Sequence, residues 1–149
     1  MQKPIATDTV AVADALRPVL LRVGRELRRE ARAVGISPEQ VSLLAAIKYA
    51  PGIGSRELAA RERISAPALT KHVDRLERDG LVARTPSPDD GRRIDLALTE
   101  EGQRVLRKVR SRRTAWLATR LRGLGADELA AVEAAIEPLA HLLKEEESH

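Results

Sequence analysis

Two neighbouring segments of the chain carry side chains that could bind double-stranded DNA. The first holds small and polar residues along one side of a helical pattern: Ser65, Pro67, Ala68, Thr70, Lys71 and Arg75. The second follows a turn-rich stretch and holds Asp90, Arg92 and Arg93. Hydroxyl and ammonium groups can hydrogen-bond base edges in the major groove, and guanidinium groups can bind phosphates or enter the minor groove. This pattern indicates recognition of DNA and not catalysis.

The helix that must present the first segment is predicted over about residues 65 to 78. Leu69, Val73 and Leu76 recur at three- and four-residue spacing, which indicates an inner face packed on a preceding helix. Ser65 is placed to cap the start of this helix. The outer face carries small and polar side chains, so it is slim enough to enter a major groove about 12 Å wide.

Two short strands, over about residues 81 to 85 and 93 to 98, are predicted to follow as a β-hairpin. In the second run the apolar side chains of Ile94, Leu96 and Leu98 fall on every other residue, which is the period of a strand. The stretch between the runs is dense in Pro, Ser, Asp and Gly, which favour a turn. The hairpin would place the two arginines beside the helix, as a wing does.

The rest of the sequence predicts further helices by its apolar spacing. They span about residues 9 to 33, 37 to 49, 55 to 63, 100 to 122 and 127 to 144. Gly35 is placed to end the first, Ser37 and Gln40 form a capping box at the second, and Thr99 can cap the fifth. The fold class is therefore mainly α with a small β-hairpin wing: a winged helix-turn-helix with additional N- and C-terminal helices. A length of 149 residues suits one domain.

Composition excludes several kinds of site. The chain has no Cys, so disulfides, thiolate zinc sites, iron–sulfur clusters and thiol switches are excluded. The three His residues lack ligand spacing, so we expect no metal and no cofactor. No nucleophile–base pair or phosphate-binding Gly loop is recognisable, which argues against an enzyme. No apolar run is long enough to span a membrane and no secretory segment is visible, so we expect a soluble, cytoplasmic protein.

The formal net charge of +4 is distributed unevenly along the chain. Residues 55–95, which contain the predicted DNA-reading motif, sum to only +1. Residues 104–122 sum to +8, and residues 123–149 sum to −6. We expect the basic run to be a solvated helix face that also pairs with the acidic last helix of the same chain or of a second copy, although flanking DNA contacts are an alternative.

At this point the sequence resembles the MarR family of bacterial transcription regulators. The stretch from Ile64 to Val82 is similar to the recognition helix of that family. Residues 84–102 are similar to its wing and the helix that follows, through an Asp-x-Arg pair and a Leu-Thr-x-x-Gly motif. The resemblance covers nearly the whole chain. One departure is Gly91, which stands between Asp90 and Arg92 where many members have Arg, and so removes one phosphate contact.

The resemblance implies roles for the residues of the two segments. Arg92 would enter the minor groove, steadied by Asp90. Thr70 and Lys71, with the small Pro67 and Ala68, would face the major groove. Arg75 would hold a phosphate.

The resemblance also implies an obligate homodimer. Residues 37–99 would form the DNA-binding lobe, and residues 8–34 and 100–147 the dimerisation region. Two-fold symmetry would set two recognition helices about 34 Å apart on an imperfectly palindromic operator. The protein would be a repressor, released by a small anionic or aromatic effector. The other hypothesis is a winged-helix protein-interaction module without a specific DNA site.

Three residues are candidates for the effector pocket. Tyr49 and Trp116 are the only aromatic side chains in the chain, and Arg22 could draw an anion towards the dimer crevice. Two of them have another interpretation: Trp116 lies in the apolar register of its helix and fits a dimer core, and Arg22 fits a solvated surface.

Overall fold

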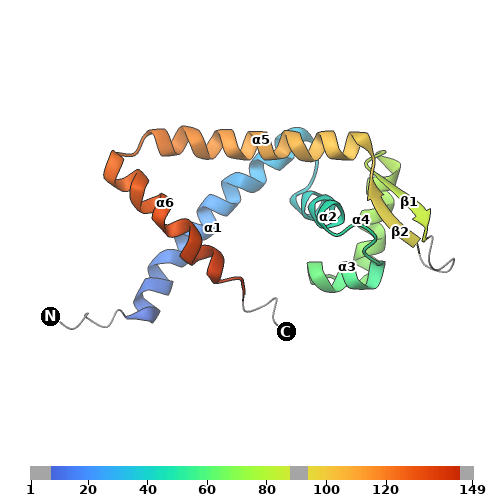
Figure 1. Cartoon of the computed structure of the whole chain (residues 1–149), viewed down its shortest axis with the longest axis horizontal. Coiled ribbons are helices and arrows are strands. Elements are labelled where there is room, and N and C mark those ends of the chain that lie inside the picture. The colour runs from blue at the N-terminus through green and yellow to red at the C-terminus, as the bar shows by residue number, and fades with distance from the viewer. Residues whose placement is uncertain (1–7, 88–93, 145–149) are drawn as a thin grey trace. The chain divides into compact units, whose positions relative to one another are not determined.

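The computed structural model describes residues 8–87 and 94–144, and there it contains six helices and a two-stranded hairpin (Figure 1). In chain order the elements are α1 (Thr9–Val34), α2 (Pro38–Tyr49), α3 (Ser55–Glu62), α4 (Ala66–Arg78), β1 (Val82–Pro86), β2 (Ile94–Leu98), α5 (Glu100–Arg122) and α6 (Ala126–His141). The predicted winged helix-turn-helix fold is confirmed, with every element in the expected order. Among the described residues, no helix is both long and apolar enough to cross a membrane.

The chain divides into two compact units. The first ends at Arg113 and holds α1 to α4, the hairpin and the first part of α5. The second begins at Thr114 and holds the end of α5 and α6.

The core of the first unit is built from aliphatic side chains. In this unit α2 contacts α1, α3 and β2, and α4 contacts α3 and β1. The largest fully buried side chains are Leu43, Leu44, Ile47, Leu58, Leu76, Leu106 and Val109. They come from α2, α3, α4 and α5. Among the described residues, the core is therefore closed by Leu, Ile, Val and Ala side chains.

The predicted helix ends are confirmed where local hydrogen bonds define them. The Ser37 hydroxyl accepts from the Gln40 N–H at 3.2 Å, and the Gln40 side chain accepts from the Ser37 N–H at 3.3 Å. The Ser65 hydroxyl accepts from the Ala68 N–H at 3.2 Å. Gly35 ends α1 with φ of 92°, a left-handed conformation that only Gly adopts without cost.

The start of α5 is locked against the end of α4. Thr99 donates its hydroxyl to the Gly80 carbonyl at 2.6 Å and accepts the Gly102 N–H at 3.0 Å. The Thr99 N–H donates to the Leu81 carbonyl at 3.1 Å. A Cβ on Gly102 would lie 2.1 Å from that same carbonyl oxygen. These contacts explain why the Thr-x-x-Gly motif requires Thr at position 99 and Gly at position 102.

Candidate nucleic-acid interface

Helix α4 separates an apolar inner face from a polar outer face. Leu69, Val73 and Leu76 are buried, as their spacing predicts. The residues predicted to read DNA lie on α4 or at its cap: Ser65, Pro67, Ala68, Thr70, Lys71 and Arg75. All of these are exposed except Ala68, which is half-buried. The structure thus brings the six residues together on one helix.

The first turn of α4 is small and carries no acidic side chain. Its backbone can therefore come close to an anionic surface, which the positive end of a helix favours. One turn further, the Thr70 hydroxyl donates to the Ala66 carbonyl at 3.0 Å, so its lone pairs face outward as acceptors. Lys71 has no hydrogen bond or ion pair with any described residue, and its ammonium group is available to a ligand. Arg75 is engaged by Asp79 in an exposed ion pair of 3.3 Å.

The turn between α3 and α4 depends on Arg63. This residue has φ of 54°, and within the described ranges it is the one non-Gly residue with positive φ. Its N–H donates to the Ala60 carbonyl at 3.2 Å, and the following Ile64 N–H donates to the Ala59 carbonyl at 3.1 Å. The chain therefore ends α3 and begins α4 within three residues. The Ser65 cap predicts a break between the helices, but nothing in the sequence predicts the left-handed conformation of Arg63, because Gly normally occupies such a position.

The hairpin carries the wing. Strands β1 and β2 are antiparallel, with Val82 opposite Leu98 and Pro86 opposite Ile94. The predicted wing residues Asp90, Arg92 and Arg93, together with Gly91, lie outside the residues that the structure describes.

A double ion pair joins the hairpin to α4. Arg84 on β1 pairs with Asp74 and with Glu77, both on α4. The partners of Arg84 are 7 and 10 residues away in the chain, on another element. No local pattern could have found this contact.

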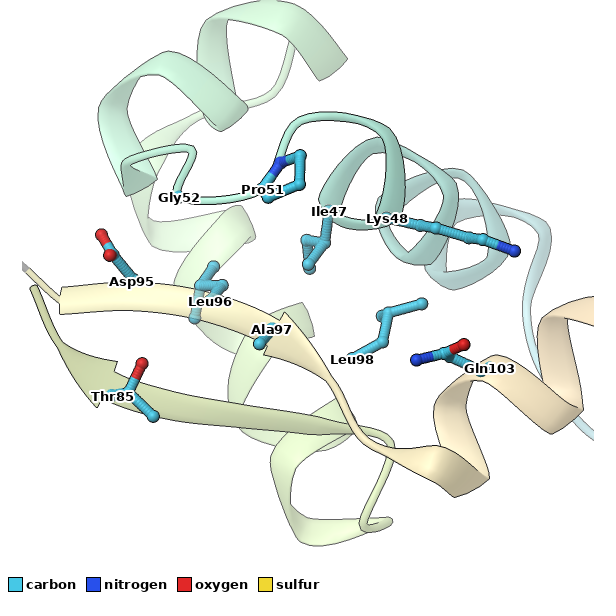
Figure 2. Close-up of a pocket in the computed structure, with 10 residues that line it drawn as sticks. All are labelled: Ile47, Lys48, Pro51, Gly52, Thr85, Asp95, Leu96, Ala97, Leu98 and Gln103. Carbon is cyan, nitrogen blue, oxygen red and sulfur yellow. The ribbon is translucent and has the colours of Figure 1, made fainter.

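A cavity of about 440 Å³ lies between the end of α2, strand β2 and the start of α5 (Figure 2). Ile47, Leu96 and Leu98 line its apolar part. At one end Lys48 and Gln103 provide polar groups, and Asp95 lies at the opposite end. The cavity can accommodate an apolar group between two polar ends.

The three predicted effector residues are not gathered at this cavity. Tyr49 is 60% exposed, with the Lys48 ammonium 5.8 Å and the Arg110 guanidinium 5.0 Å from its ring centroid. Tyr49 itself does not line the cavity, but its neighbour Lys48 does. Arg22 is exposed on α1. Trp116 belongs to the second unit.

Trp116 has a cationic neighbour of its own. The Arg120 guanidinium lies 5.2 Å from the Trp116 ring centroid, one turn further along α5. A guanidinium at this distance over the face of an indole ring is attracted by its quadrupole. The Trp116 side chain is half-buried.

The basic run on α5 makes contacts within its own helix and with α1. Arg104 pairs with Glu101 in its own helix, and Arg112 pairs with Glu30 of α1 at 3.0 Å. Arg113 donates to the Leu27 carbonyl at 3.0 Å. Burial lowers the pKa of the Arg113 guanidinium, and the nearby positive charge of Arg28 lowers it further. Within the first unit Arg112 and Arg113 therefore attach α5 to α1.

Comparison with known proteins gives consistent matches. The model of the MarR family matches residues 36–94. An uncharacterised HTH-type transcriptional regulator of Mycobacterium bovis is 30% identical over 134 residues, which are 90% of this chain and 94% of that protein. The HTH-type transcriptional repressor MdtR of Bacillus subtilis is 32% identical over 115 residues, 77% of this chain and 74% of that protein. The crystal structure of a transcriptional regulator from Thermotoga maritima superposes with a TM-score of 0.74 at 29% identity, covering 95% of this chain and 99% of that chain.

Proposed function

The chain belongs to the MarR family of winged helix-turn-helix transcription regulators, and from that premise we propose that it is a homodimeric repressor of a palindromic operator. A small anionic or aromatic effector releases it from DNA. The observation that carries this proposal is the two-sided character of α4. Its apolar inner face is buried and anchors the helix, while its outer face exposes small and polar groups. The family consists of regulators and not of enzymes.

The proposed DNA contacts divide by groove. Ser65, Thr70 and Lys71 bind base edges in the major groove, and the small Pro67 and Ala68 allow the helix to approach. Arg75 exchanges its exposed partner Asp79 for a phosphate, which costs little because an exposed ion pair contributes little. In the wing, Arg92 enters the minor groove and is steadied by Asp90, and Arg93 binds a phosphate beside that groove.

A footprint on DNA upstream of the protein's own gene tests this function. Protection should be two-fold symmetric, with half-sites about one helical turn apart, and should weaken steeply with salt. Equal and weak binding to all fragments would instead favour the protein-interaction module, a hypothesis kept open by the charge of only +1 on residues 55–95.

The proposed release acts through two populations of the dimer. The effector binds better to a dimer whose recognition helices are wrongly spaced for DNA, so it shifts the equilibrium away from the DNA-binding form. Its proposed contacts are Tyr49, Trp116 and Arg22. The two cations beside the Tyr49 ring support an anionic or aromatic ligand there, since they attract a negative group towards an aromatic surface. The footprint is expected to disappear when aromatic carboxylic acids that bind the protein are added.

Replacing Lys71 with Ala is expected to relax sequence preference at one base pair of each half-site. Loss of a base contact costs about 1–3 kcal/mol for the preferred base and less for the others. The measurement is a titration against operator variants substituted at each position. Lys108→Ala is the matched control, because it removes the same charge from an exposed site on α5. A uniform loss over all variants would mean that Lys71 holds a phosphate.

Replacing Arg92 with Ala is expected to weaken operator binding while the dimer survives. A guanidinium in the minor groove is attracted by the strong negative potential there, and its removal lowers the slope of affinity against salt by about one unit. Affinity is measured at several salt concentrations, and light scattering verifies the dimer. Unchanged affinity at moderate salt would remove Arg92 from the interface.

A further inference from the structure

Arg84 is the one side chain of β1 that the structure pairs with α4 through charge. Its Nε lies 3.0 Å from a Glu77 carboxylate oxygen, and a terminal nitrogen contacts Asp74. The Arg84 side chain is 34% exposed, which is less than either partner. One rigid guanidinium thus holds two carboxylates three residues apart on the same helix, and its planar fork of donors suits that geometry.

Apolar packing between α4 and the hairpin is incomplete at this place. A small cavity of about 60 Å³ lies beside Arg84, lined also by Thr70, Val73 and Leu96. Arg84 therefore lines this cavity and also makes both ion pairs with α4. Asp74 is one helical turn from Thr70 and is exposed on the same side of α4, so the ion pairs lie next to the proposed base-reading residues.

We propose that Arg84 is a positioning residue for DNA recognition, which sets the wing relative to the recognition helix so that both reach their grooves together. The inference rests on the proposed function and extends it to a residue that need not touch DNA. Helix α4 and the wing must engage one rigid duplex at once. A hairpin that pivots away from α4 therefore loses the wing contacts even when α4 is correctly seated.

Positioning and simple electrostatics predict opposite changes in DNA affinity when the acidic partners of Arg84 are neutralised. Asp74 and Glu77 are the two acidic residues of α4. Removing negative charge from a DNA-facing helix favours binding to phosphates. If the carboxylates hold the wing in place, removing them weakens binding instead. The sign of the effect therefore separates positioning from simple electrostatics.

The test compares wild type with Asp74→Asn/Glu77→Gln, with Arg84→Gln, and with the triple variant. The acid pair variant and Arg84→Gln should each lose about tenfold in operator affinity, and the triple variant should be no worse than either, because all three break one coupled contact. Hydroxyl-radical protection of the flanking minor grooves should be lost while methylation protection in the major groove persists. Glu101→Gln/Arg104→Gln is the matched control, since it breaks an exposed ion pair within α5. A role in folding alone would reduce the bound fraction but leave the footprint of the bound protein unchanged.

Two results would overturn the proposal. One is an acid pair variant that binds as tightly as wild type, or more tightly, with intact flanking protection. The other concerns hydrogen exchange of the free protein. The proposal predicts that Arg84→Gln speeds exchange of the β1–β2 amides several-fold and leaves exchange of the α2 amides unchanged. Unchanged exchange in the hairpin would show that Arg84 does not hold it. If wild type protects no DNA, the proposed function fails, and the exchange result still decides whether Arg84 holds the wing.

Discussion

Gly102→Ala is expected to destabilise the protein by about 3 kcal/mol, at the upper end of the cost of overpacking. The added Cβ would lie 2.1 Å from the Leu81 carbonyl oxygen and 3.0 Å from its carbon. That carbonyl cannot move aside freely, because it also accepts the Thr99 N–H at 3.1 Å. Helix propensity alone predicts the reverse, since Gly to Ala in a helix interior stabilises by about 0.5–1 kcal/mol.

Gly24→Ala is the matched control, in the interior of α1. Its Cβ would meet only the end of the flexible Arg28 side chain, at 3.3 Å. We expect it to stabilise by about 0.5–1 kcal/mol. Urea denaturation followed by circular dichroism measures both variants at one protein concentration, because the stability of a dimer depends on concentration. Equal effects of the two substitutions would show that the backbone at Leu81 yields, contrary to this account.

Ile136→Glu is expected to dissociate the proposed dimer and to reduce operator affinity by about 10²–10⁴-fold. Helix α6 has no buried residue, and Leu129, Val132 and Ile136 are 42%, 42% and 64% exposed along one face. A monomeric soluble protein rarely leaves such a continuous apolar face in water. Our proposed dimer covers it, and a carboxylate placed there would be buried without a partner.

The loss of affinity follows from linked binding. A dimer engages two half-sites, and the second contact is made at a high effective concentration, which raises affinity by about 10²–10⁴-fold over a single contact. Ala134→Glu adds the same charge to the opposite face of α6 and should leave the dimer intact. Sedimentation equilibrium and operator titration measure both variants. An Ile136→Glu protein that stays dimeric would exclude this face from the interface.

Features that depend on neighbours in the chain could be predicted from the sequence. The cap at Ser65 and the buried stripe of Leu69, Val73 and Leu76 are both set within one helix, so their spacing is sufficient evidence. The end of α6 was predicted at residue 144 and lies at His141. The apolar spacing thus overestimates the length of this helix at its C-terminal end, where helix bounds are least well defined by local pattern.

Features that depend on contacts between elements could not be predicted. Arg84 has no local pattern that links it to α4, and Arg112 reaches Glu30, 82 residues away. Thr99 was predicted as a cap, but its hydroxyl also donates to the Gly80 carbonyl, 19 residues earlier. Spacing along one helix identifies which residues share its face. How the wing is held against that face depends on the tertiary fold.

The contact between Gly102 and Leu81 has a consequence for evolutionary analysis. Gly102 is restricted by a carbonyl oxygen, which every residue at position 81 would supply. The Leu81 side chain is selected by a different environment, the apolar core in which it is buried. Substitutions at the two positions should therefore be statistically independent across relatives, although the residues touch. Methods that infer proximity from correlated substitutions would miss this contact, while position 102 alone would show strong restriction to Gly.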